Sequence, residues 1–183
     1  NTAGAVSIGA SGSVTKGTGT WTFDGTTATT YEDLASTKNN IGTVAITKTN
    51  ATPSNNKVTL NTASGNYMKV DSLTISANNT LDLASGGYTL ELANAGATAT
   101  VLTVSGTLTP GTSTVKYTAT NSAGNVNVAT TTYNSLQFTP ASAETYDLTG
   151  NLTVANALTG NLTIDTNATL DTTLANSYGI TLA

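Results

Sequence analysis

Ten carboxylates and six lysines are the charged side chains with which this chain could do chemistry. The 183 residues include no histidine, cysteine or arginine. Without histidine or cysteine, a Ser-His-Asp or Cys-His catalytic site, a thiolate or imidazole metal site and a disulfide framework are all excluded. Six lysines against ten acids also argue against a nucleic-acid surface built on phosphate contacts. The chemistry that remains is that of paired carboxylates, calcium sites and surface recognition.

The carboxylates do not form a recognisable catalytic pair. Asp82 and Asp171 occupy equivalent positions of an internal repeat, as expected for a duplicated turn or surface residue. Asp71 and Asp165 are not duplicated, and neither has a recognisable partner in the sequence. The glycine-rich nonapeptide repeat and the EF-hand loop that bind calcium are absent from the sequence. We therefore predict no enzymatic activity, no catalytic residue, no metal site and no cofactor.

Aromatic residues could contribute to a glycan-binding surface. Trp21, Phe23 and the seven tyrosines are the side chains that could stack on sugar rings. In the internal repeat, however, Val115 and Tyr117 take the places of Trp21 and Phe23. This replacement favours core or corner packing for Trp21 and Phe23 over a sugar-binding platform.

Residues 31–40 form the most charged excursion of the sequence. They include Glu32, Asp33 and Lys38, and they fall where the two halves of the chain differ. If any surface patch makes lateral contacts or binds a ligand, this loop is the first choice. Its beginning, residues 31–35, is the nearest approach to a helical pattern and could form one helical turn.

Modification is a further possibility. Five N-x-S/T sequons offer candidate glycosylation sites, although 20 asparagines among 57 serines and threonines produce about that many by chance; they begin at Asn50, Asn78, Asn151, Asn161 and Asn167. Lysines could also form isopeptide cross-links to asparagine or aspartate, but the sequence does not select a pair.

The elements that must position these side chains are short β-strands. Threonine, alanine, asparagine, glycine and serine make up 118 of the 183 residues. Apolar residues alternate with polar ones over very short runs, which indicates half-buried strands; examples are VAI at 44–46, LTI at 73–75 and LTI at 162–164. Clusters of glycine, asparagine, serine and threonine separate the runs and are typical of turns. Strands this short suit an all-β parallel β-helix, or β-solenoid, better than a sandwich.

An internal duplication supports the solenoid. Residues 73–82 match residues 162–171 at seven of ten positions, at an offset of 89. Residues 11–23 match residues 105–117 at six of thirteen positions, at an offset of 94. We predict two homologous modules, residues 1–93 and 94–183, that form one continuous solenoid. With about 22 residues a coil, the chain would make about eight coils and advance about 40 Å.

The two ends of the chain continue the repeat. Residues 88–93 match residues 178–183 at an offset of 90, and a second copy placed after Ala183 would keep this register. Natural solenoids usually cover their end coils with polar caps, and neither end of this sequence resembles one. Three interpretations stay open: one period of a longer tandem-repeat polypeptide, a subunit that stacks head to tail, or a closed monomer with strand exchange.

Strings rich in threonine, asparagine and glycine run through the chain, among them GTWTFDGTT, VDSLTISANNTLDLASGGYTLELA, LTVSGTLTPGTSTVKYTAT and the pair GNLTV and GNLTI. They resemble the parallel β-helix repeats of very long bacterial cell-surface and adhesin-like proteins, over nearly the whole chain. The resemblance implies a stalk, adhesin or surface fibre. Enzymes with this fold, such as pectate lyases, use aspartate and arginine clusters with calcium, and this sequence has no arginine.

We therefore expect a structural unit of an extracellular or cell-surface filament that assembles with itself by end-to-end β-stacking. The alternative is an adhesin segment that binds glycans or another surface through an exposed solenoid face. From the balance of charges, we expect no nucleic-acid partner. We also expect no membrane span, because no apolar stretch approaches about 18 residues. The residues expected at the assembly interface are Asn1, Thr2, Val6, Ile8, Tyr178, Ile180, Leu182 and Ala183.

Overall fold

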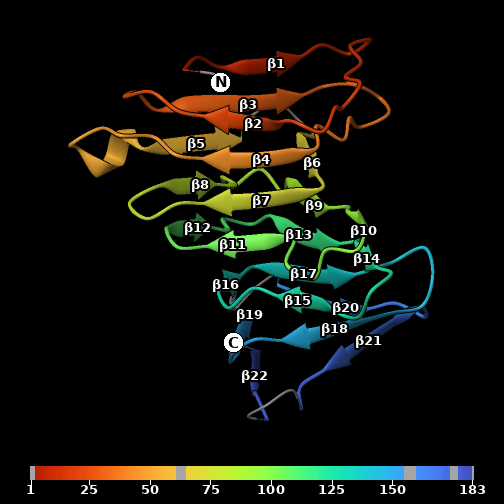
Figure 1. Ribbon diagram of the computed structural model, residues 1–183. Helices are drawn as coiled ribbons and strands as arrows, with labels where there is room; N and C mark the ends of the chain where they lie inside the picture. The colour runs from red at the N-terminus through yellow and green to blue at the C-terminus, as the bar shows by residue number, and fades with distance from the viewer. Residues whose placement is uncertain (1–2, 61–64, 155–159, 174–176, 183) are drawn as a thin grey trace.

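The chain folds as the predicted all-β parallel β-solenoid. A computed structural model describes residues 3–60, 65–154, 160–173 and 177–182. Short strands form the rungs of a stack, with β1 (Val6–Ile8) at one end and β22 (Ile180–Leu182) at the other (Figure 1). Every pairing between the described strands is parallel.

The strands form five stacked sheets and one two-stranded ladder. Sheet A contains β2 (Thr20–Phe23), β4 (Thr43–Ile46), β7 (Ser72–Ile75) and β11 (Leu102–Val104). Sheet B contains β1, β3 (Thr29–Asp33), β5 (Lys57–Leu60), β8 (Thr80–Asp82) and β12 (Thr107–Thr109). Sheet C contains β6 (Tyr67–Val70), β9 (Thr89–Leu92), β13 (Thr114–Tyr117), β17 (Ser135–Phe138) and β20 (Leu162–Ile164).

The remaining strands lie nearer the C-terminal end of the stack. Sheet E contains β15 (Val126–Val128), β18 (Glu144–Leu148) and β21 (Ala168–Asp171). Sheet F contains β16 (Thr132–Tyr133), β19 (Leu152–Val154) and β22. The short ladder pairs β10 (Ala95–Gly96) with β14 (Thr120–Asn121), and one 3-10 turn, η1 (Pro53–Asn55), precedes β5.

The coils are longer and fewer than the sequence suggested. Residues paired in neighbouring strands are separated by 20 residues at Val126 and Tyr146 and by 29 residues at Val44 and Leu73. The structure therefore has about seven turns, where the sequence suggested about eight coils of about 22 residues. Coil length varies because the strands are short and the loops between them differ in length. The boundary between modules 1–93 and 94–183 stays a prediction, since the stack continues across it.

The period-2 pattern of the sequence places columns of apolar side chains on the inner faces of the sheets. In sheet A, Phe23, Ile46 and Ile75 follow one another in register, and all three are fully buried. Burying each such side chain stabilises the fold by roughly 1.5–3 kcal/mol. The residues that alternate with them face outward and are mostly threonine. The core is thus a row of short apolar layers along the axis rather than one globular centre.

The wall of the solenoid changes midway along the stack. Sheets A and B end at β11 and β12, and sheets E and F begin at β15 and β16, whereas sheet C runs past this point from β6 to β20. Aromatic residues fill the interior here: the ring centroids of Tyr117, Phe138 and Tyr146 lie 4.8–6.0 Å apart. Large rings suit this position because they can fill the interior where the cross-section changes.

Buried tyrosine hydroxyls in this region are satisfied by a closed set of hydrogen bonds. The Ala129 N–H donates to Oη of Tyr117 (3.2 Å), and Oη of Tyr133 donates to the Ala129 carbonyl (2.7 Å). Because Tyr133 already donates its proton, the 3.3 Å contact between the hydroxyls requires Tyr117 to donate to Tyr133. Burial raises the pKa of Tyr117 to about 12, so the network stays protonated at neutral pH.

Three buried asparagines hold the corners between successive coils. Each side-chain amide accepts a backbone N–H and donates to a backbone carbonyl of the preceding coil, as a backbone peptide group would in a ladder. We call these residues the asparagine clamps: Asn39 bonds Val14 N and Gly12 O, Asn66 bonds Asp33 N and Tyr31 O, and Asn79 bonds Lys48 N and Lys48 O.

Two local expectations can now be decided. Residues 29–33 form strand β3, and Tyr31 is fully buried in sheet B, so the expectation of a helical turn at residues 31–35 was wrong. Pairing of Tyr31 with Val6 and Leu60 overrides the local pattern. Core packing of Phe23 is confirmed, because its ring is fully buried and meets that of Tyr31 edge-on at 6.5 Å, while Trp21 is half-buried against the core.

The clamp at Asn79 generates a stability prediction. Asn79→Ala leaves the buried N–H of Lys48 without its acceptor, which lies at 2.7 Å, and should lower the free energy of unfolding by about 1–3 kcal/mol in chemical denaturation. The neighbouring Asn78 is exposed and has a left-handed backbone (φ 61°). Asn78→Gly should therefore change the stability by less than about 0.5 kcal/mol. Equal losses of unfolding free energy in the two variants would contradict the role of Asn79 as a clamp.

Candidate functional site

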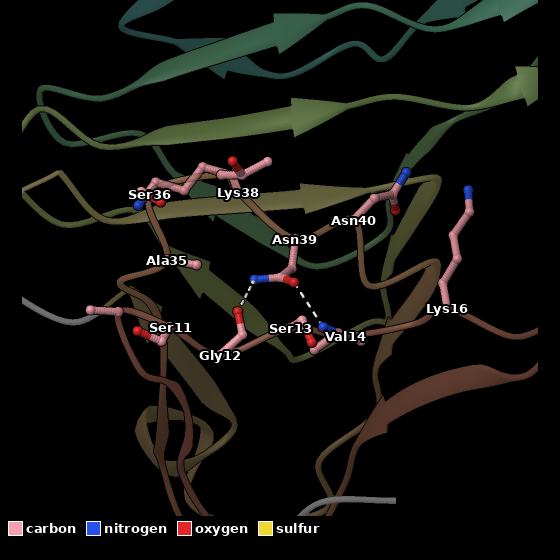
Figure 2. A pocket seen from close by; sticks show the side chains of 12 residues that line it. Ser11, Gly12, Ser13, Val14, Lys16, Ala35, Ser36, Lys38, Asn39 and Asn40 are labelled. Carbon is pink, nitrogen blue, oxygen red and sulfur yellow. Dashed lines mark hydrogen bonds between the residues drawn. The ribbon is translucent and has the colours of Figure 1, made fainter.

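A groove lies near the β1 end of the stack. Residues 10–14 and Lys16 form one wall, and residues 35–40 of the next coil form the other (Figure 2). The groove has a volume of about 450 Å³. Its lining is mainly serine, threonine, asparagine and alanine, with the amines of Lys16 and Lys38. We call it the corner groove.

The charged loop at residues 31–40 supplies one wall of this groove, but it uses its charges internally. The Asp33 carboxylate is fully buried and accepts hydrogen bonds from the backbone N–H groups of Ala35 (2.9 Å) and Asn39 (2.8 Å). The Lys38 amine donates to the Asp33 carbonyl at 2.8 Å. Asp33 and Lys38 therefore shape the loop, and Asp33 does not face a ligand. Glu32 lies on β3 and accepts a hydrogen bond from the Ser7 hydroxyl at 2.8 Å.

One end of the groove contains a cluster of three polar side chains from three coils. The Lys16 amine lies 2.6 and 2.7 Å from the two carboxylate oxygens of Asp71. The Asn40 side chain donates to Oδ1 of Asp71 at 2.8 Å. We call these residues the Lys16–Asn40–Asp71 cluster. No partner of Asp71 was recognisable in the sequence, because its partners lie 31 and 55 residues away and only the stacking brings them together.

The repeated carboxylates are turn residues, as the sequence predicted. Asp82 ends β8 and accepts the N–H of Ala84 at 2.9 Å, and Asp171 ends β21 and accepts the N–H of Thr173 at 2.7 Å. Both make the same local turn two residues long. Asp82 also pairs with Lys57 at 3.3 Å. Asp165 is exposed and accepts the N–H of Thr166.

Glu91 is the centre of a second polar cluster, on the outer face of sheet C. It is 7% exposed and accepts hydrogen bonds from the Tyr67 hydroxyl (2.5 Å), the Thr118 hydroxyl (2.8 Å) and the Lys69 amine (3.1 Å). Burial by itself would raise the pKa of Glu91, but the bonds from Tyr67, Thr118 and Lys69 and the lysine charge outweigh it and lower the pKa. Burial and the bond to Glu91 raise the pKa of Tyr67.

Lys48 carries a buried amine that the sequence did not point to. The residue is 3% exposed, and its amine donates to the carbonyls of Thr27 (2.8 Å) and Asp24 (3.0 Å) in the turn before β3. Burial lowers the pKa of Lys48, and the nearby Asp24 charge opposes that shift. Its contacts are to backbone carbonyls, so it holds a turn of the preceding coil. No spacing in the sequence distinguishes it from the other lysines.

The residues expected at an assembly interface lie at the two ends of the stack. Val6 and Ile8 belong to β1, and Ile180 and Leu182 belong to β22, which Tyr178 shortly precedes. Asn1, Thr2 and Ala183 lie outside the described residues.

Four of the five sequon asparagines are exposed, namely Asn78, Asn151, Asn161 and Asn167, and Asn50 is half-buried. Asn50 donates its amide to the Thr26 carbonyl, which competes with modification. Glycosylation at all five stays a prediction.

Among the described residues there is neither a metal-binding cluster nor a membrane-spanning helix. Across residues 3–60, 65–154, 160–173 and 177–182, no three side chains of the metal-binding acidic, histidine or cysteine types gather closely enough to hold a metal ion. In the same part of the chain, no helix has the length and apolar character needed to span a membrane.

The fold and its clusters define a parallel β-solenoid with polar corners. Comparison of the chain with protein-family models, with curated proteins and with solved structures finds no match.

The Glu91 cluster predicts a loss of stability in acid. Its folded-state pKa lies below the ordinary value of 4.5, so its stabilisation is complete above that value and is lost as the pH falls through the lowered pKa. Glu91→Gln should therefore flatten the fall in the free energy of unfolding below about pH 4.5. Thr114→Ser, on the same outer face, is the matched control and should leave the pH profile unchanged. An unaltered profile in Glu91→Gln would refute the role of the cluster.

Proposed function

We propose that this chain is a structural unit of an extracellular or cell-surface filament, built by β-stacking of solenoid coils end to end. The observation that carries the proposal is that the last described coil has open strand edges. Among the described residues, its strands β20, β21 and β22 pair on one side only, with β17, β18 and β19. Unpaired strand edges are templates for further pairing.

The apolar columns of this coil support the same conclusion. Ile164 is 47% exposed, whereas Phe138, its partner in the preceding coil, is fully buried. Leu182 is 66% exposed, whereas its partner Val154 is 2% exposed. Each exposed side chain would be covered by one more coil of the same kind. At the other end, β1 pairs only with β3 among the described strands and offers a parallel edge.

The partner in this assembly is another copy of the same solenoid, either as a separate subunit or as the next period of a tandem repeat. A head-to-tail contact between unlike ends generates a fibre when it continues along one axis, as stacked coils do, and does not close into a ring. The work of such a unit is mechanical and not enzymatic. The lack of cysteine suits an exposed location, where no reducing compartment protects thiols.

Substitutions at the open columns test the proposal. The purified chain should form linear assemblies that grow with concentration, visible by electron microscopy and sedimentation. Ile164→Asp combined with Leu182→Asp should abolish them, because buried carboxylates at the junction would be unpaired. The control is Thr163→Asp with Thr181→Asp, which alters the outward face of the same strands and should still assemble. A wild-type chain that stays at 18.4 kDa at every concentration would exclude stacking.

A second candidate function is glycan recognition, and the corner groove favours it. Hydroxyl and amide groups line a cavity of about 450 Å³, which is large enough for a small saccharide. The chain should then bind members of a glycan array, and Thr37→Trp should abolish binding by filling the groove. Ser122→Trp, on an exposed turn remote in sequence from the groove, is the control. An array without any signal would remove this candidate.

A further inference from the structure

The Lys16–Asn40–Asp71 cluster has the arrangement of a covalent cross-linking site. An amine and a carboxamide are both hydrogen-bonded to the same carboxylate oxygen, Oδ1 of Asp71, at 2.6 and 2.8 Å. Lys16 and Asn40 come from neighbouring coils and Asp71 from the next one. We propose that Lys16 and Asn40 join in an intramolecular amide bond, with Asp71 as the proton carrier.

The orientation of the Asn40 amide suits this reaction. Its Oδ1 accepts the backbone N–H of Gly42 at 2.9 Å, and this bond fixes the nitrogen Nδ2 toward Asp71. During attack on Cγ, negative charge develops on that same Oδ1, where the Gly42 N–H stabilises it. The leaving nitrogen faces the carboxylate that can protonate it.

The chemistry balances without an oxidant, reductant or further reactant. Asp71 takes one proton from the Lys16 ammonium, and the neutral Nζ attacks Cγ of Asn40. The Nζ–Cγ bond forms and the Cγ–Nδ2 bond breaks, while Asp71 passes its proton to Nδ2, which leaves as ammonia. Nζ loses a second proton to solvent, where ammonia becomes ammonium. A lysine ammonium and a carboxamide thus become a secondary amide and an ammonium ion.

Proximity and solvent access favour the forward reaction. The carboxylate holds both reacting groups at one place, which replaces a bimolecular encounter by a reaction within one cluster. The side chain of Asp71 is 18% exposed and that of Lys16 is 43% exposed, so the reacting groups are in contact with water. Ammonia released at the exposed end of the groove diffuses away, so the reverse reaction finds no nucleophile.

The bond would tie the first two coils together covalently, across the wall of the corner groove. Lys16 lies between β1 and β2, and Asn40 lies between β3 and β4. Figure 2 shows the two side chains at the same end of the groove. This tie does not depend on filament formation, because all three residues belong to one chain.

Intact-mass spectrometry of the purified, denatured chain tests the proposal. The expected mass is that of the sequence less one ammonia, and proteolysis should yield one branched peptide that joins Lys16 to Asn40. A chain with its full sequence mass would overturn the proposal. Loss of one water, with a link from Lys16 to Asp71, would also overturn it, because the acceptor would then be the aspartate.

Two variants and one internal control locate the chemistry. Lys16→Arg should restore the full mass by removing the nucleophile, and Asp71→Asn should restore it by removing the proton carrier while keeping the shape. Circular dichroism on both variants confirms that the solenoid is intact. Lys57 and Asp82 form an ion pair at 3.3 Å in the same protein, and the accompanying bond to Asp82 comes from the Ala84 backbone instead of a carboxamide. Lys57 should therefore stay unlinked in every sample, and a linked Lys57 would show that the reaction does not require the cluster.

Discussion

Parallel, in-register pairing along the solenoid axis is the constraint on which the rest of the structure depends. It places equivalent residues of successive coils about 4.8 Å apart, so each side chain must be compatible with its neighbours in the same column. On the inner faces of the sheets, columns of like apolar residues meet this requirement, as at Phe23, Ile46 and Ile75. On the outer face of sheet C the solution is alternation of charge, with Glu91 between Lys69 and Lys116. The low charge of the chain as a whole satisfies the same constraint.

The corners are where pairing fails, and polar side chains take over there. A buried N–H or carbonyl that no strand can reach must find another partner. The clamps at Asn39, Asn66 and Asn79 provide both a donor and an acceptor to the coil before them, and the Lys48 amine serves two carbonyls of a turn. Part of the asparagine content of the sequence thus has a specific structural role at the corners.

The sequence predicted the fold correctly but only part of the corner groove and its polar cluster. Alternation at 44–46 and 73–75 predicted strands correctly, because each such run reports which face is buried. The number of coils was not predictable from the same pattern, since connections of one to more than ten residues separate the strands. Residues 31–40 were identified from their charge as a candidate surface, whereas the opposite wall of the corner groove at 10–14 and the partners of Asp71 were not. Those contacts are decided by coil length, which leaves no local signal.

The variable length of the coils has a consequence for how such a fibre would respond to load. Hydrogen bonds between coils run along the axis, so axial tension acts on them directly, and each coil can detach from the end without disturbing more than its neighbour. A detached coil of 20–29 residues releases roughly 65 to 105 Å of extended chain in place of about 4.8 Å of rise. Stretching would therefore proceed in discrete, unequal steps, and a filament of these units would absorb work by lengthening many-fold before its backbone came under strain.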